Sequence, residues 1–122
     1  MKNFRRLVLG LLLVSLAGAS WGDVSYELFY KAHDDVESQQ LAQTAAGATA
    51  IAFMYYNAWS IRKGLPRAFC PPAGLVLDAD IVIGLTRRWG EILQRTNDFD
   101  PSVSWSAYAL GALEKAYPCT ER

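Results

Sequence analysis

The sequence is poor in the residues that carry most catalytic and metal-binding chemistry. It contains one histidine, His33, and two cysteines, Cys70 and Cys119, among 122 residues. One imidazole and two distant thiols do not form a metal-ligand cluster, and a lone histidine beside acidic residues is usually a solvated surface group. The G-x-S-x-G, H-E-x-x-H and glycine-rich phosphate-loop patterns are also missing. By elimination we expect a binding protein, with no enzymatic activity, no metal and no cofactor.

Alternation of apolar and polar residues, which marks half-buried strands, is also scarce. The stretch 76–83 is the one segment that could instead form a strand, but its acidic residues are better suited to the start of a helix. Helical spacing of apolar residues, bounded by capping residues and prolines, predicts helices over 24–33, 37–62, 78–95 and 101–117. The sequence therefore predicts an all-α fold, a small domain of about four helices.

The longest predicted helix, 37–62, carries two apolar stripes. One stripe falls at spacings of three and four residues and consists of Leu41, Ala45, Ala48, Ala52, Tyr55 and Trp59. A second apolar set, which includes Ala46 and Phe53, lies beside it. Because more than one face is apolar, we expect this helix to be central and packed on two sides.

The N-terminus has the organisation of a secretory signal peptide. A basic start precedes an apolar run over 7–17 and a small-residue cleavage pattern at 17–19. We expect residues 1–19 to be the signal peptide, with cleavage after Ala19 or Gly22, and residues 23–122 to form one domain. The alternative is an uncleaved anchor, but the run is well short of the ~20 residues that span a bilayer. The expected location is an exported, oxidising compartment.

The charge balance excludes a nucleic-acid or membrane footprint. The chain has 12 basic and 12 acidic residues. Removing Lys2, Arg5 and Arg6 with the signal peptide leaves nine basic residues against twelve acidic ones, a net charge of −3. No basic patch for nucleic acid or anionic lipid is expected from this balance. A protein or small-molecule partner fits better.

The two cysteines lie in proline-flanked settings, Phe69-Cys70-Pro71-Pro72 and Tyr117-Pro118-Cys119. In an oxidising compartment, two cysteines in a small domain most often form a disulfide. The alternatives are a reactive thiol or a metal ligand. A reactive cysteine prefers a basic neighbour or a helix N-terminus, and Cys119 follows the C-terminal end of its helix.

Arginine and aromatic residues supply the candidate contacts for a partner. Arg87, Arg88 and Trp89 adjoin one another, and Phe99 lies in a polar turn after the same helix. These residue types dominate the energetics of protein interfaces. The competing interpretation is that Trp89, like the other tryptophans, belongs to the core.

Several of these motifs together resemble the Rap/Tai family of periplasmic immunity proteins, which protect bacteria against type VI secretion amidase effectors. The motifs are the alanine-rich run 43–48, Gly64, the Phe-Cys-Pro-Pro segment at 69–72, and the closing pattern of Leu110, Leu113 and Tyr117-Pro118-Cys119. The resemblance covers residues 41–119. The chain differs from many relatives in lacking a second cysteine pair near the first helix.

The resemblance implies a small helical domain with a Cys70–Cys119 disulfide, usually a homodimer, that binds a cognate peptidoglycan amidase and blocks its catalytic cleft. We expect the turn over 95–101 to enter that cleft, supported by the preceding helix. The predicted partner-binding residues are Arg87, Arg88, Trp89, Arg95, Asn97, Asp98 and Phe99. The alternative function is a periplasmic chaperone of the acid-stress type.

Overall fold

The computed structural model describes residues 24–31 and 35–120. Within these ranges it contains four helices, α2 (Tyr26–Lys31), α3 (Val36–Arg62), α4 (Ala79–Arg95) and α5 (Trp105–Ala116). The β-type pairing in the same ranges is one isolated antiparallel bridge between Ser25 and Ser104. The predicted all-α class and the Cys70–Cys119 disulfide are confirmed. The predicted signal peptide and His33 lie outside the described residues.

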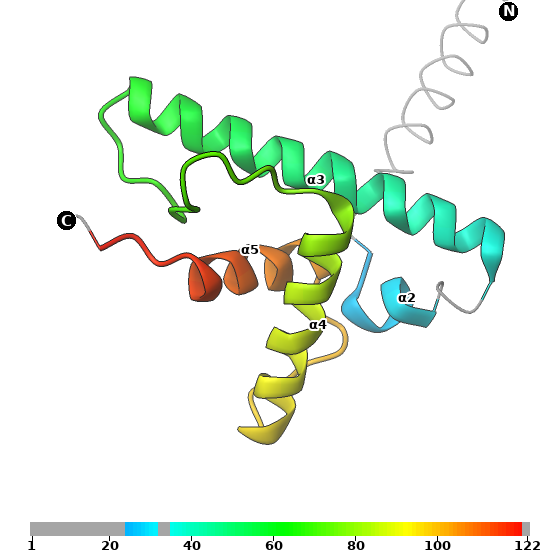
Figure 1. Ribbon diagram of the computed structural model, residues 1–122. Coiled ribbons are helices and arrows are strands. Elements are labelled where there is room, and N and C mark those ends of the chain that lie inside the picture. Colours follow the sequence, from blue (N-terminus) through cyan, green and yellow to red (C-terminus); the bar gives the residue numbers. More distant parts are fainter. Residues whose placement is uncertain (1–23, 32–34, 121–122) are drawn as a thin grey trace, which may run out of the picture.

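α3 lies across one side of the molecule, with α4 and α5 beneath it (Figure 1). Its start is fixed by Asp35, whose carboxylate accepts hydrogen bonds from the Ser38 amide at 3.1 Å and the Ser38 hydroxyl at 2.9 Å. An N-cap of this kind contributes about 1 kcal/mol to helix stability. The helix ends before Gly64, whose positive φ of 69° turns the chain into the connector.

Only one face of α3 is covered within the described residues, so the expectation of packing on two sides is wrong. Its buried residues are Ala42, Ala46, Ala50, Asn57 and Ser60. The stripe that begins at Leu41 and ends at Trp59 is exposed. A helix of 27 residues is roughly 40 Å long, and the shorter helices of this small domain are packed against the opposite face alone.

α4 packs against both α3 and α5. Asp78 caps it through a hydrogen bond from the Ile81 amide to the Asp78 carboxylate at 2.9 Å. Its interior positions Val82 and Thr86 are fully buried. α4 leads away from α3, so its C-terminal end lies on the side of the molecule remote from α3 (Figure 1).

α5 begins at Trp105, later than the expected start at Pro101. Instead, the backbone of residues 101–105 forms hydrogen bonds with the segment that leads into α2. The Tyr26 amide donates to the Val103 carbonyl at 2.9 Å, and the Trp105 amide donates to the Val24 carbonyl at 2.7 Å. Ser104 then caps α5, since its hydroxyl accepts from the Ala107 amide at 3.2 Å. This tertiary pairing outweighs the local preference of Asp-Pro for a helix start.

An aromatic cluster joins α2 to α4 and α5. The Phe29 ring stacks on Trp105 with centroids 4.1 Å apart and an interplanar angle of 14°. The Tyr30 hydroxyl donates to the Ile83 carbonyl at 3.0 Å. Tyr26 lies against Gly90, where a side-chain Cβ would overlap its hydroxyl and ring. α2 is therefore held by three aromatic side chains although it has only six residues.

Candidate functional site

The turn that follows α4 has a fixed backbone. Asn97 adopts a φ of 59°, in the left-handed region, directly after the helix. The Asp98 amide donates to the Leu93 carbonyl at 3.0 Å, and the Asn97 amide donates to the Gln94 carbonyl at 3.4 Å. These two bonds form a Schellman motif with asparagine in the position that glycine usually takes. The exposed side chains of Asn97 and Asp98 are thus presented from a defined corner.

The other end of the turn is fixed by Tyr108. Its hydroxyl donates to the Asp100 carbonyl and accepts from the Asp100 amide, both at 2.9 Å. The Asp100 carboxylate accepts from the hydroxyl and the amide of Ser102, at 2.6 and 2.9 Å. These Ser102 hydrogen bonds lower the pKa of Asp100 below its ordinary value. The turn between α4 and α5 is therefore tied down at both ends.

Phe99, one of the predicted partner-binding residues, is half-buried within the protein itself. Its ring meets Tyr26 edge-on at 5.0 Å and stacks on Tyr108 at 5.7 Å with an interplanar angle of 20°. Aromatic pairs at these separations contribute about 0.5–1.5 kcal/mol each beyond their buried area. Much of the Phe99 side chain therefore holds the turn against α2 and α5.

Trp89 and Arg87 are also partly committed to internal contacts. Trp89 is half-buried beside α5, and a Cβ at Gly111 would lie 3.0 Å from its indole nitrogen. The Arg87 guanidinium lies over the Tyr30 ring, 5.0 Å from its centroid. Burial raises the pKa of Tyr30 to about 12, and the Trp105 indole, whose N–H donates to the phenol oxygen at 3.4 Å, acts in the opposite direction.

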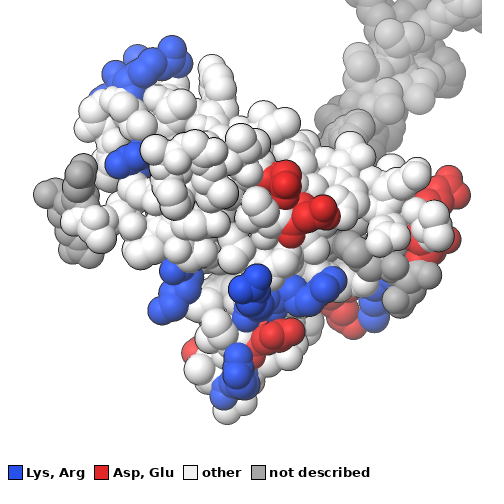
Figure 2. All heavy atoms as spheres, in the orientation of Figure 1, with Lys and Arg blue, Asp and Glu red and all other residues white. Residues whose placement is uncertain are grey.

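The exposed basic residues of α4 form a charged edge next to the turn. Arg87, Arg88 and Arg95 are all exposed, and the Arg95 Nε donates to the Glu91 carbonyl at 3.3 Å. The ion pair found in the described ranges joins Lys31 to Glu27 within α2, so the α4 guanidinium groups have no carboxylate partner there. Figure 2 shows basic side chains gathered over this part of the molecule. The guanidinium groups of α4 are therefore available to pair with acidic side chains of a partner protein.

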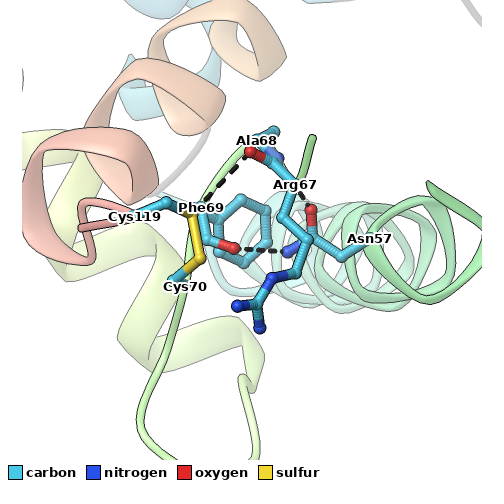
Figure 3. Close-up of a disulfide and its surroundings, with 6 residues drawn as sticks. All are labelled: Asn57, Arg67, Ala68, Phe69, Cys70 and Cys119. Atoms are coloured by element: carbon cyan, nitrogen blue, oxygen red, sulfur yellow. Dashed lines mark hydrogen bonds between the residues drawn. A yellow bond between two sulfur atoms is a disulfide. The ribbon is translucent and has the colours of Figure 1, made fainter. Parts of the chain in front are cut away.

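The disulfide fastens the end of the chain to the connector that follows α3 (Figure 3). The Cys70 amide donates to the Tyr117 carbonyl at 2.7 Å, next to the Cys70–Cys119 bond. Phe69, directly before Cys70, is fully buried. The buried Asn57 side chain donates to the Phe69 carbonyl at 2.7 Å and accepts from the Ala68 amide at 3.1 Å. Covalent and hydrogen bonds thus secure the connector at the same place.

A cleft of about 890 Å³ lies beside the disulfide. The residues that line it come from the end of α3, the connector and the C-terminal segment: Ile61, Gly64, Leu65, Pro66, Arg67, Cys70 and Cys119. The Cys119 sulfur lies 3.7 Å from the Arg67 carbonyl oxygen. The lining contains one basic side chain, Arg67, and no free thiol, because Cys70 and Cys119 form the disulfide.

A large apolar surface lies on the outer face of α3. Leu41 is 70% exposed, Ile51 71% and Tyr55 68%. A shallow hollow of about 410 Å³ on this face is lined by Ala52, Tyr55, Tyr56 and Trp59. Periodicity finds the stripe in the sequence, but assigning it to the core was wrong. Interaction surfaces and cores share the same apolar spacing.

No metal-ligand cluster is present among the residues that the structure describes. These residues contain no group of three or more histidine, cysteine, aspartate or glutamate side chains placed to hold a metal ion. None of the described helices is long and apolar enough to cross a bilayer. The charged edge of α4, the fixed turn and the outer face of α3 are thus the principal candidate sites.

No protein-family model, curated protein or solved structure matches this chain.

Proposed function

We propose that the protein is a periplasmic immunity protein that binds a cognate type VI secretion peptidoglycan amidase and occludes its catalytic cleft. The observation that carries the proposal is the turn between α4 and α5, fixed by the Schellman motif at Asn97 and by Tyr108 at Asp100. A segment that enters a cleft binds more tightly when it loses little conformational freedom on binding. The resemblance of the cysteine motifs to the Rap/Tai family supports the same role.

The predicted partner-binding residues divide into two roles in this proposal. Asn97 and Asp98 reach the amidase from the corner of the turn, and the Arg87, Arg88 and Arg95 side chains contact the rim of its cleft. Phe99 and Trp89 act mainly by positioning, because their rings pack against α2 and α5. The protein itself has no catalytic role.

Binding to any peptidoglycan amidase encoded by a neighbouring gene tests the proposal. We expect a stable complex and loss of amidase activity on peptidoglycan. Asn97→Gly removes the side chain and keeps the left-handed backbone, and Asp98→Asn removes the charge; each should weaken the complex roughly tenfold, as loss of a central contact does. Glu114→Gln, an equivalent change on the exposed surface of α5, is the control.

Two outcomes would contradict the proposal at different levels. Full affinity in the Asn97→Gly, Asp98→Asn and Arg88→Ala variants would show that another surface enters the cleft. Failure to bind or inhibit any neighbouring amidase would remove the immunity function altogether.

A second candidate is a periplasmic chaperone, and the exposed apolar face of α3 is the observation in its favour. A holdase binds unfolded clients through such surfaces. Suppression of client aggregation should then be measured at acidic and at neutral pH. Protection that is lost in an Ile51→Glu variant would favour the chaperone; no protection at either pH would remove it.

A further inference from the structure

The acidic residues are unevenly distributed along the chain. Residues 38–77, which form most of α3 and the connector, contain no aspartate or glutamate. The basic residues of the same stretch are Arg62, Lys63 and Arg67, and all three are exposed. Figure 2 shows basic side chains at the end of α3 that leads into the connector and acidic ones near its other end. The balance of 12 basic and 12 acidic residues, from which we expected no surface for anionic lipid, does not reveal this separation.

The three cations lie among large apolar side chains. These side chains are between 37% and 68% exposed and are those of Tyr55, Tyr56, Trp59, Ile61 and Leu65. Arg62 and Lys63 follow Trp59 by three and four residues, the spacings at which side chains of one helix are neighbours. Arg67 lines the same cleft as Ile61 and Leu65. Residues 55–67, which we call the α3 tip, thus combine exposed apolar and basic side chains.

This combination is typical of a segment at a membrane–water interface. Tryptophan and tyrosine rings are enriched at the level of the lipid headgroups. Lysine and arginine lay their methylene stems along apolar surface while their charges reach the headgroups. The ion pair found in the described ranges joins Lys31 to Glu27 on α2. The cations of the α3 tip therefore have no carboxylate partner there that a headgroup phosphate would have to displace.

The α3 tip is less suited to a glycan or to a protein. A glycan is held through hydrogen bonds to its hydroxyl groups, but the amide and aliphatic hydroxyl side chains of the tip, Asn57 and Ser60, are both buried. Asn57 is also engaged with the backbone of Phe69 and Ala68. Protein interfaces are depleted of lysine and require a complementary shape. A bilayer surface adapts to whatever shape the tip presents.

We propose that the α3 tip docks reversibly on the surface of a bilayer that contains anionic phospholipid. Trp59 and its apolar neighbours enter the headgroup layer, and the basic side chains pair with lipid phosphates. Each basic residue near such a surface strengthens binding roughly fivefold. Asp35 and Glu37, at the opposite end of α3, would be repelled by the same surface. The tip therefore makes the contact, and the remainder of the outer face of α3 does not lie flat on the lipid.

Docking in this way leaves the turn over 96–101 accessible. The turn follows the end of α4 remote from α3, whereas the α3 tip lies at the end of α3 that leads into the connector (Figure 1). Attachment to lipid and binding of an amidase thus use different parts of the molecule. The inference stands whether or not the protein is an immunity protein.

Co-sedimentation of the disulfide-bonded protein with phospholipid vesicles tests the charge contribution. We expect binding that rises with the fraction of phosphatidylglycerol in phosphatidylcholine vesicles and falls as salt is added. Lys63→Gln should raise the dissociation constant roughly fivefold. Lys31→Gln removes the same charge from an exposed position on α2 and is the matched control, with no change expected. Residues before position 24 are the same in every variant, so differences between variants report the described residues.

Lipids with brominated acyl chains test the apolar contribution, because bromine quenches indole emission on contact. We expect quenching of wild-type emission by anionic vesicles, and loss of that quenched component in Trp59→Phe. Trp59→Gln should weaken binding roughly tenfold, since it removes apolar area from the contact. Leu28→Gln, at a position on α2 that is 59% exposed, should leave binding unchanged. Circular dichroism of each variant should match the wild-type protein, because all of these side chains are partly or fully exposed.

Several results would overturn the proposal. One is a wild-type protein that does not bind anionic vesicles, including one that binds insoluble peptidoglycan instead. Another is equal binding to neutral and anionic vesicles, which would remove the role of the cations. Equal weakening by Lys63→Gln and Lys31→Gln would show a general charge effect. Binding without quenching of Trp59 would place the contact on another part of the molecule.

Discussion

Asn57 donates a 2.7 Å hydrogen bond to the carbonyl of Phe69, the residue immediately before the disulfide-bonded Cys70. Its amide oxygen accepts from Ala68, so one buried side chain satisfies two backbone groups of the connector. We expect Asn57→Leu to lower the free energy of unfolding by about 2–4 kcal/mol, because it leaves both groups unpaired. Urea denaturation measures the change. A loss below about 0.5 kcal/mol would contradict this role.

The disulfide should contribute substantially to stability. A loop of about 50 residues corresponds to roughly 4 kcal/mol in the chain-entropy estimate. We expect Cys70→Ser and Cys119→Ser to destabilise by similar amounts, and the double variant to cost little more than either, because all three remove the same bond. Denaturant midpoints of the three variants provide the measurement. Additive losses would show that each cysteine also acts separately.

Gly90 and Gly84, both on α4, should respond to alanine in opposite ways. At Gly90 the new methyl group would overlap Tyr26, and we expect a loss of about 1–3 kcal/mol. At Gly84 a Cβ meets nothing within 4 Å, so Gly84→Ala should stabilise by up to ~1 kcal/mol through helix propensity. Thermal unfolding of the two variants compares them directly. Equal shifts would mean that the Tyr26 contact is easily relieved.

The energetic cost of the positive φ at Asn97 can be tested by substitution. Asn97→Ala should cost about 1 kcal/mol, because alanine lacks the local hydrogen bonds that let asparagine occupy a positive φ. Asn97→Gly should be neutral to within a few tenths of a kcal/mol. Comparing unfolding free energies of the two variants removes the common effect of losing the amide side chain. A glycine variant as unstable as the alanine variant would exclude backbone strain.

Tyr30 should make stability fall at high pH. Burial raises its pKa from 10.0 to about 12 in the folded protein. The stabilising contribution of the neutral phenol is complete below pH ~10 and is lost as the pH rises toward 12, because the unfolded chain releases this proton first. Phenolate absorbance should show a tyrosine that titrates late, and Tyr30→Phe should remove it. Titration of every tyrosine near its ordinary pKa would contradict this expectation.

Helix number and type could be predicted from the sequence because apolar periodicity and capping residues are local signals. Asp78 and Gly64 mark helix ends in both the sequence and the structure. The start of α5 could not be predicted, since it depends on hydrogen bonds between residues 101–105 and the segment before α2. Such pairing joins positions far apart in the chain. Local preference at Asp100-Pro101 gives no sign of it.

The interaction surfaces were harder to predict for a different reason. The α3 stripe and the aromatics of the turn carry the same apolar signal, yet Trp59 is exposed and Phe99 is half-buried. Which apolar face is covered depends on how many other helices are present to pack on it. Arg87, Arg88 and Arg95 were easier to place outside, because an unpaired guanidinium is costly to bury.

The unequal surroundings of two tryptophans give the molecule its own optical reporters. Trp59 is 37% exposed on the outer face of α3, whereas Trp105 is 3% exposed and stacked on Phe29. Indole emission shifts to longer wavelength in water, so the two rings should emit at different wavelengths. A shift in the Trp59 emission would report binding at the outer face of α3, while the Trp105 emission reports unfolding of the core. Because Trp21 and Trp89 also emit, replacing both with phenylalanine allows the two processes to be observed separately in unlabelled protein.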